Sequence, residues 1–245
     1  MDHKASVRER VWGDLRKVAL PDSRFHFDFG EFIADFEGSA DAVARLTSHR
    51  YYQNADIIFV APDNCLEQLR LQALRDGKRV LMTTYSIKRG FWVLDPTKIA
   101  PEDYETAAML DGMERLADPV SLADIAALPS VDYLITGTGA INHDGVRFGK
   151  GHGFFDVEWA ILHMLERITK ETPAAAVVHD CQLLDETLYP DTFDTVVDVV
   201  FTPTRTIEVA DPQKPTCGIL WDRLDPHMLD TIPPLQDLKR SAGLA

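Results

Sequence analysis

The sequence predicts an α/β fold, with an open, mostly parallel sheet and helices on both of its faces. Short, nearly continuous apolar runs alternate with helical segments, which is typical of parallel strands buried on both sides. One run–helix–run unit in the first half has the length of a right-handed βαβ crossover. No repeat or change of composition divides the 245 residues, so we expect a single domain over 1–245.

The N-terminal part of the chain predicts two helices. The first extends to about Lys17 and ends before Pro21. Its apolar stripe consists of Val7, Val11, Leu15 and Val18. A shorter helix follows in SADAVARLTSH, and Ser39 is expected to cap its N-terminus.

The βαβ unit is the clearest of the predicted elements. ADIIFVA (55–61) and KRVLMTTY (78–85) predict two buried strands. Between them, the Pro-Asp-Asn triplet at 62–64 supplies helix start signals, and Gly77 suits the C-terminal stop. The two strands should therefore lie parallel in one sheet.

The second half repeats the alternation of strands and helices. Strands are predicted over 131–137, 174–180 and 196–202, with a helix from Phe154 to about Lys170. TIEV and GILWD are short candidate strands near the end. The proline-rich tail, about 230–245, is expected to be loosely attached.

Charge and cysteine content limit the classes of function. The chain has 25 basic and 39 acidic residues, a net charge of −14, which disfavours a nucleic-acid binder. Cys65, Cys181 and Cys217 are few and far apart, which favours reduced thiols in the cytoplasm. The charged N-terminus predicts no signal peptide, and no apolar run approaches the length of a membrane span.

The most informative stretch is GVRFGKGHGFFDVEWAI (145–161), where glycines alternate directly before a helix. Gly149, Gly151 and Gly153 let atoms approach the backbone closely, and the helix beginning near Phe154 adds its unpaired N–H groups. With the charge of Lys150, the loop has the parts of a phosphate cradle. The alternative is a turn that only joins a strand to a helix, since GKGHG is neither the P-loop nor the dinucleotide motif.

Two titratable side chains in or beside this loop are further candidates for the phosphate site. Asp156, in the first helical turn, is a candidate ligand for a Mg²⁺ ion bound to the same phosphates. His152, inside the loop, is a candidate phosphate ligand or acid. Phe155 and Trp159 are more typical of a core.

The loop resembles that of the 5-formyltetrahydrofolate cyclo-ligases (methenyltetrahydrofolate synthetases), where GRGGGYYD opens a helix. GKGHGFFD (149–156) stands here. Lys4 and Arg8 match the family's Lys-x-x-x-Arg pattern in the first helix. The family's downstream order fits Gln182, Pro190, Asp194, Asp198 and Thr202. RERVW (8–12) and FTPTRTI (201–207) resemble a divergent, cyclo-ligase-like branch, and the resemblance covers nearly the whole chain.

This resemblance implies a fold like those of ribose-5-phosphate isomerase and CoA transferases, and a reaction that uses ATP and Mg²⁺. In the family, ATP phosphorylates the formyl oxygen of 5-formyltetrahydrofolate, a neighbouring amine attacks, and 5,10-methenyltetrahydrofolate forms as phosphate leaves. The resemblance implies that ATP and its phosphates are bound by Lys4, Arg8, Gly149, Lys150, Gly151, His152, Gly153 and Phe154. It implies Asp156 as the metal ligand, and Lys150, His152 and Phe155 as catalytic residues.

The loop also departs from the family pattern. His152 replaces a glycine, Phe154 and Phe155 replace tyrosines, and Val157 stands where the family usually has Arg or Lys. These changes argue against the cyclo-ligase reaction more than against phosphate binding. Three functions therefore stay open: an ATP-dependent cyclo-ligase acting on a folate or another formylated amine, a non-catalytic nucleotide or folate binder, and a sugar-phosphate isomerase of the same fold.

Several other polar residues follow predicted strands. His179 and Asp180, the Lys88–Arg89 pair and Arg205 are candidates for substrate or phosphate contacts, each with a structural alternative. Trp92 would stack on a planar ring or simply pack. A metal site formed by His143, His152 and His179 is an alternative, but these residues do not have the sequence spacing that is typical of metal ligands. The expected partner is a folate-like small molecule, without nucleic acid or membrane, bound by a cytoplasmic monomer or homodimer.

Overall fold

The computed structural model describes residues 3–243, which build a large sheet with helices on both faces. Within these residues the sheet has eight strands in the order β11-β10-β8-β5-β1-β2-β3-β4. Neighbouring strands from β10 to β2 pair in parallel, and the other three pairs are antiparallel. The strands are β1 (Ile57–Val60), β2 (Arg79–Thr83), β3 (Phe91–Leu94), β4 (Asp118–Val120), β5 (Tyr133–Thr136), β8 (Ala174–Val177), β10 (Val199–Phe201) and β11 (Thr206–Glu208). The predicted fold class is confirmed.

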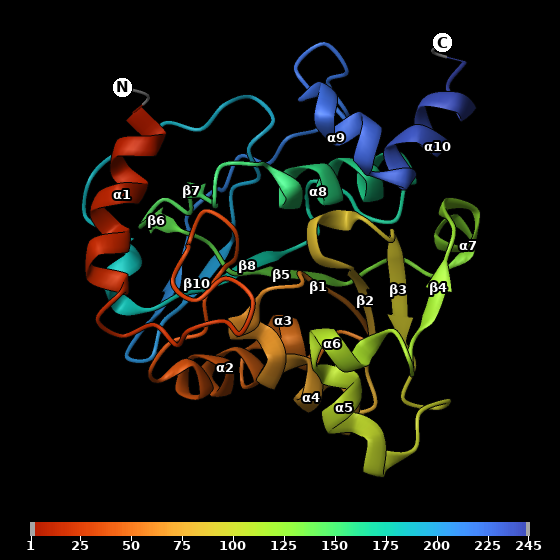
Figure 1. Ribbon diagram of the computed structural model, residues 1–245, viewed down its shortest axis with the longest axis horizontal. Coiled ribbons are helices and arrows are strands. Elements are labelled where there is room, and N and C mark those ends of the chain that lie inside the picture. Colours follow the sequence, from red (N-terminus) through yellow and green to blue (C-terminus); the bar gives the residue numbers. More distant parts are fainter. Residues whose placement is uncertain (1–2, 244–245) are drawn as a thin grey trace.

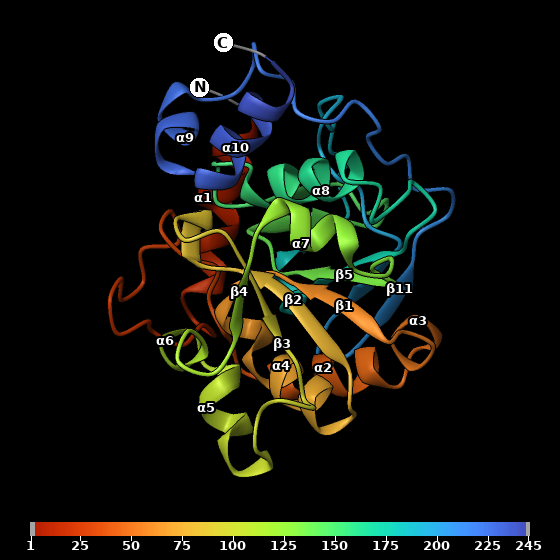
Figure 2. The ribbon, with the colours of Figure 1, turned by 90° about the vertical axis from the view of Figure 1, so that its right-hand side faces the viewer.

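Helices cover the two faces of this sheet in separate layers (Figures 1 and 2). On one face lie α2 (Ser39–Thr47), α3 (Arg50–Gln53), α4 (Glu67–Arg75), α5 (Tyr104–Ala108) and α6 (Leu110–Met113). On the other lie α7 (Leu122–Ala127), α8 (Phe154–Met164), α9 (Pro226–Thr231) and α10 (Pro233–Ser241). The central strands are buried along their whole length, which explains their continuous apolar sequences. No helix among the described residues is both long and apolar enough to cross a membrane.

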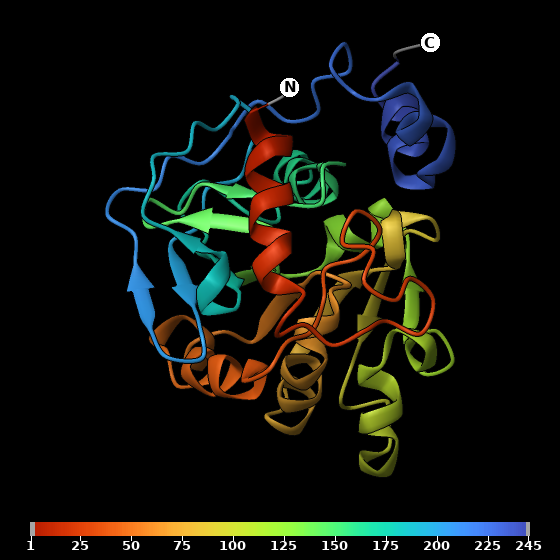
Figure 3. The same cartoon turned by 60° about the vertical axis from the view of Figure 1, so that its left-hand side comes forward.

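A second, small sheet stands beside the first and carries the N-terminal helix. It joins β7 (Arg147–Phe148), β6 (Ala140–Asn142) and β9 (Leu183–Leu184). Helix α1 (His3–Leu15) lies in front of it (Figure 3). Val7 and Val11 pack there against Phe148 and its neighbours, so the apolar stripe predicted for this helix is the buried one.

Local details differ from the sequence predictions. The N-cap of α2 is Gly38, with φ of 81°, and Ser39 is the first helical residue. Helix α8 ends at Met164 rather than near Lys170. GILWD (218–222) forms no strand within the described part of the chain, whereas TIE does, as β11. Four 3₁₀ turns, η1 (Asn64–Leu66), η2 (Tyr85–Ile87), η3 (Pro101–Asp103) and η4 (Asp180–Gln182), also lie within residues 3–243.

The C-terminal tail is not loosely attached, up to residue 243. Ile232, between α9 and α10, and Leu235 of α10 are completely buried in the main hydrophobic core, and Leu238 is almost so. Prolines at the first positions of both helices are compatible with helix, because the N–H they lack has no intrahelical partner there. The proline content of the tail is therefore no sign of loose attachment.

This packing makes a measurable prediction. Leu235→Ala should lower the free energy of unfolding by about 2–5 kcal/mol, because a fully buried leucine is removed. Chemical denaturation measures the change. Leu20→Ala, at a half-exposed position, is the control and should have little effect. An equal, small effect of both substitutions would mean that the tail is loosely attached after all.

Candidate functional site

A cavity of about 300 Å³ lies where β1 and β5 end, beneath the glycine loop and beside α1. This is the edge at which open α/β sheets bind ligands. All residues that the sequence assigned to the site line it: Lys4, Arg8, Gly149, Lys150, Gly151, His152, Gly153, Phe154, Phe155 and Asp156. The fold thus brings together a helix from the start of the chain and a loop from its middle. The role of each residue stays a prediction.

The glycine loop connects β7 to α8 and has the conformation that its glycines allow. Gly151 has φ of 109°, and Gly153, the N-cap of α8, has φ of 72°. Side chains rarely adopt these values. A Cβ atom at Gly151 would also lie 3.3 Å from the guanidinium of Arg8. The loop therefore needs glycine at these two positions, both for its path and for the approach of Arg8.

Arg8 and Lys150 place positive charge at this loop. Within residues 3–243, the guanidinium of Arg8 has no hydrogen bond or ion pair. The Lys150 Nζ atom donates to the backbone oxygen of Glu31 at 2.6 Å and to the Tyr85 hydroxyl at 2.9 Å. Burial lowers the pKa of Lys150 to about 8, against the opposing effect of nearby carboxylates. An anion in the cavity would therefore meet one open guanidinium and one partly desolvated amine.

Lys4 is tied to the far rim of the cavity. Its Nζ atom donates to Asp191 and to Asp194, at 2.6 Å each. Burial alone would lower the pKa of Lys4, but the two hydrogen bonds outweigh it and raise the pKa. Lys4 thus holds two carboxylates in place beside the cavity, in addition to any contact with phosphate.

Asp156 forms a buried ion pair that the sequence did not reveal. Its Oδ1 atom accepts from Arg147 at 2.5 Å and from the backbone N–H of Thr195 at 2.8 Å. The Arg147 side chain is only 5% exposed, and it covers the ring of Phe155. Burial raises the pKa of Asp156, although Arg147 opposes this effect. The pair anchors the first turn of α8 to the small sheet.

The donor set fits a metal ion held mainly by phosphate. No group of three or more His, Cys, Asp or Glu side chains with metal-binding geometry exists within the described residues. Mg²⁺, however, is commonly bound by one or two carboxylates together with phosphate oxygens and water. Asp156 leaves Oδ2 without a hydrogen bond in residues 3–243, and Asp194 lies near enough to raise its pKa. These carboxylates would hold the ion.

Two further carboxyl groups form the inner wall of the cavity and were not predicted. Glu158, on α8, is 1% exposed and accepts a hydrogen bond from Thr83 at the end of β2. Asp63 accepts from the Gly137 N–H at 2.7 Å, after β5. The sequence suggested only a helix start signal for Asp63. For Glu158, the available signal was a charged residue within an otherwise apolar helix.

Glu158 gives the protein a characteristic pH dependence. Burial raises its pKa to about 8, so between about pH 4.5 and 8 the folded state holds a proton that the unfolded chain releases. Its contribution to stability is therefore lost as the pH rises through this window, by on the order of 4 kcal/mol. Glu158→Gln should gain in Tm relative to wild type from pH 5 to pH 9. For the exposed control Glu102→Gln, the difference in Tm from wild type should not change with pH. A Tm difference for Glu158→Gln that does not change with pH would contradict the raised pKa of Glu158.

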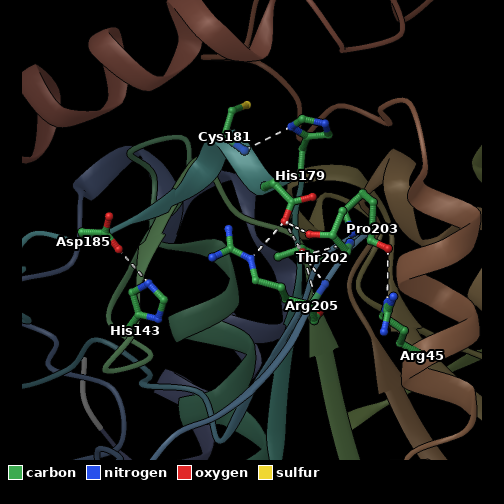
Figure 4. A network of polar contacts seen from close by, with 10 residues as sticks. Arg45, His143, His179, Cys181, Asp185, Thr202, Pro203 and Arg205 are labelled. Atoms are coloured by element: carbon green, nitrogen blue, oxygen red, sulfur yellow. Dashed lines mark hydrogen bonds and ion pairs between the residues drawn. The ribbon is translucent and has the colours of Figure 1, made fainter.

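Other predicted candidates lie away from this cavity, in a network around the ends of β8 and β10 (Figure 4). Asp180 pairs with Arg205 at 3.3 Å and accepts from Thr202 at 2.7 Å. His179 accepts from the N–H of Cys181, and His143 contacts Asp185. Arg205 therefore forms a structural ion pair with Asp180, which was the structural alternative for this residue. His143, His152 and His179 form no metal cluster among the described residues.

Arg89, from the Lys88–Arg89 pair, and Trp92 also have structural partners. Arg89 forms an ion pair with Glu114, and the Trp92 indole donates to the backbone oxygen of Arg89 at 3.1 Å. Cys65, Cys181 and Cys217 are free thiols. None of these residues lines the cavity.

Known proteins are similar to this chain in sequence and in fold. A profile of the 5-formyltetrahydrofolate cyclo-ligase family matches residues 1–203. Methenyltetrahydrofolate synthase domain-containing proteins of Mus musculus and Homo sapiens are 31% and 30% identical over 240 residues, which is 96% of this chain. The chain spans 63% and 61% of the lengths of these two relatives.

A solved structure gives the same result for the fold. The NMR structure of Aquifex aeolicus 5,10-methenyltetrahydrofolate synthetase superposes with a TM-score of 0.52 at 16% identity, covering 86% of this chain and 95% of the other. The profile and the relatives each match most of the chain, and so this protein belongs to the 5-formyltetrahydrofolate cyclo-ligase family.

Proposed function

We propose that the protein is an ATP- and Mg²⁺-dependent, cyclo-ligase-like enzyme that acts on 5-formyltetrahydrofolate or a related formylated amine. The observation that carries this proposal is the positive cradle over the cavity. The loop at the N-terminus of α8 presents backbone N–H groups, and Arg8 and Lys150 add charge beside it. A helix N-terminus with two cations is suited to a polyphosphate.

In this proposal, the residues of the chain bind and orient more than they transfer protons. Lys4, Arg8 and Lys150 neutralise phosphate charge, and the loop from Gly149 to Phe154 surrounds it. Asp156, with Asp194 beside it, would hold Mg²⁺, which supplies charge neutralisation at the transferring phosphoryl group. Phosphorylation of a formyl oxygen turns a poor leaving group into a good one, so positioning of the two substrates supplies much of the catalysis.

His152 and Phe155 have different positions in this arrangement. His152 is exposed at the loop and its ring lies 5.5 Å from that of Phe154, where it would contact bound phosphate. Phe155 is 6% exposed and belongs to the main core. Its contribution would be to shape the cavity wall beneath Arg147, since it has no polar atom to offer.

A non-catalytic nucleotide or folate binder is the second candidate. The Lys150 amine already has two hydrogen-bond acceptors, Glu31 and Tyr85, and Phe154 and Phe155 supply no hydroxyl groups to a substrate. These observations favour binding without turnover.

Phosphate release from MgATP, with and without 5-formyltetrahydrofolate, tests the proposal. Methenyltetrahydrofolate absorbance is followed in the same samples. Folate-stimulated release together with product formation is expected for the enzyme. Binding of MgATP without any folate-linked turnover would instead support the binder, or an enzyme for another formylated amine.

The setting of this activity is also part of the proposal. The three free thiols suit a reducing compartment, and we place the protein in the cytoplasm. A small-molecule substrate without a nucleic-acid partner is consistent with the charge of −14. A monomer or a homodimer would serve, since one chain supplies all the residues assigned to the site.

A further inference from the structure

The chain between α1 and α2 forms a compact loop over residues 20–35. This loop contains no helix and no strand of either sheet, yet Phe32 is completely buried in it and Phe29 almost so. Its two ends meet, because the Leu20 N–H donates to the backbone oxygen of Asp35 at 2.8 Å. Loops with adjacent ends that are packed by their own side chains are frequently functional. The 20–35 loop can therefore swing about one narrow neck.

The 20–35 loop forms part of the cavity wall. The side chain of Ile33 lines the cavity. The Phe25 ring stacks on the ring of Tyr85 in η2, and the two ring centroids are 5.4 Å apart. Figure 3 shows the loop, in orange-red, between helix α1 and the yellow turn η2. The loop therefore has the position of a lid at one side of the cavity.

Lys150 connects the glycine loop to the 20–35 loop. Its Nζ atom donates to the backbone oxygen of Glu31 at 2.6 Å and to the Tyr85 hydroxyl at 2.9 Å. The same atom lies 4.2 Å from the centre of the Tyr85 ring. Glu31 belongs to the 20–35 loop, and Tyr85 is the residue on which Phe25 stacks. One amine thus holds the loop against the cavity, directly through Glu31 and indirectly through Tyr85.

Tyr85 is the fixed point of this arrangement. The two residues after it, Ser86 and Ile87, have φ of 55° and 58°, values that are rare for residues with a side chain. A strained backbone of this kind persists only where the surrounding packing determines it, and Ile87 is completely buried. If Lys150 moves, we therefore expect the 20–35 loop to respond rather than η2.

The two acceptors of Lys150 are neutral groups, which an anion can replace. A phosphate oxygen carries negative charge and attracts an ammonium group more strongly than a carbonyl or hydroxyl dipole does. An anion at the glycine loop would therefore compete with both acceptors for the same amine. The Asn64 side chain still donates to Asp22 at 2.8 Å, so the expected result is a loosened loop rather than a detached one.

We propose that the 20–35 loop is a lid latched by Lys150, and that a phosphate-bearing anion bound at the glycine loop releases it. This inference goes beyond the proposed function, because it concerns any such anion and requires neither turnover nor a second substrate. The coupling is reciprocal. A substitution that weakens the contacts of the lid should therefore strengthen anion binding.

Amide hydrogen exchange of the full chain tests the latch without any ligand. Lys150→Met should speed exchange in the 20–35 loop by at least about tenfold, because both hydrogen bonds of the amine are lost. Tyr85→Phe removes one acceptor and should have a smaller effect. Lys170→Met, at an exposed lysine, is the matched control and should leave the exchange unchanged. Unchanged exchange in β5 would show that each variant loosens the loop and not the whole protein.

Inorganic triphosphate, which has no nucleoside, tests the release. It should speed exchange in the 20–35 loop of wild type and have no further effect in Lys150→Met. Phe25→Ala, which removes the stacking on Tyr85, should bind triphosphate about twofold to tenfold more tightly than wild type. Leu20→Ala, at the half-exposed neck of the same loop, should bind it as wild type does. Thermal unfolding checks that the variants are folded.

The outcomes separate this inference from the proposed function. Triphosphate binding that slows exchange in the 20–35 loop, or leaves it unchanged, would overturn the inference and leave the proposed function standing. Equal loop exchange in Lys150→Met and wild type would do the same. Release of the loop by triphosphate, without folate-linked turnover of MgATP, would support the inference and contradict the proposed enzyme. Absence of triphosphate and MgATP binding would contradict both.

Discussion

Lys150→Met should reduce folate-stimulated phosphate release from MgATP by at least about a hundredfold. Lys150 is the positive side chain inside the glycine loop, and removal of a comparable charge-stabilising group from an enzyme site costs about a hundredfold to a thousandfold. Methionine keeps much of the side-chain volume against Tyr85 and Phe154, which Lys150 contacts. The loss should therefore be in activity rather than in folding.

The same residue makes the affinity for MgATP depend on pH. Because burial lowers the pKa of Lys150 to about 8, the free protein loses this charge as the pH rises through about 8. The affinity for MgATP should fall over this range, since a neutral amine attracts phosphate less. The dissociation constant, measured from pH 7 to pH 9, checks this.

Two comparisons make this prediction decisive. Lys150→Met should lose the pH-dependent step, whereas Lys170→Met should keep it, because Lys170 is an exposed residue that forms an ion pair with Glu171. Lys170→Met should also retain the activity. If wild-type affinity for MgATP is flat across pH 8, or if both variants behave alike, Lys150 does not contact the phosphates.

Asp156→Asn should abolish Mg²⁺-dependent turnover and destabilise the protein at the same time. The carboxylate is the proposed ligand of the ion, and it is also the partner of the buried Arg147. An arginine left buried without its partner typically costs about 3–5 kcal/mol. A lower Tm is therefore expected alongside the loss of activity, and activity alone cannot separate the two roles.

The dependence of nucleotide binding on Mg²⁺ separates them. At a temperature where the variant is folded, wild type should bind ATP more tightly with Mg²⁺ than without it. Asp156→Asn should bind metal-free ATP much as wild type does, and should show no gain when Mg²⁺ is added. Arg147→Met tests the structural role alone, because it removes the pair and leaves the carboxylate. If Mg²⁺ increases the ATP affinity of Asp156→Asn as much as that of wild type, Asp156 does not bind the metal ion.

The structure also shows which elements could be predicted from local sequence. The stripe of Val7, Val11 and Leu15 predicted α1 correctly, and the apolar runs predicted β1, β5, β8 and β10. Burial of a helix face or of a whole strand requires apolar residues at fixed spacings within a short segment, and that spacing is visible in the sequence. By contrast, β3 and β4 pair antiparallel at one edge of the sheet. β3 pairs with β2, and β4 pairs with β3, so the place of each strand in the sheet depends on the strand before it as well as on its own residues.

The tail shows the limit of composition as a guide. Its prolines suggested a loosely attached segment, while Leu235 and Leu238 have the spacing of an apolar helix face. Proline starts these helices rather than interrupting them. The outcome depended on the rest of the protein, because α10 contacts α7 and enters the main core. The apolar face of α10 is buried because the rest of the protein provides a surface against which it can pack.

The sequence by itself predicted the family and the fold class, and it singled out the positive residues and Asp156 of the candidate site. GKGHGFFD is a contiguous motif, and the Lys4 and Arg8 spacing lies within one helix, so both are visible without any structure. The carboxyl groups of the inner wall became visible only in the tertiary structure. Asp63, Thr83, Gly137 and Glu158 come from four distant segments, and the parallel sheet brings them together at one edge. A contact between distant segments leaves no local pattern, because its cause is the packing of the whole chain.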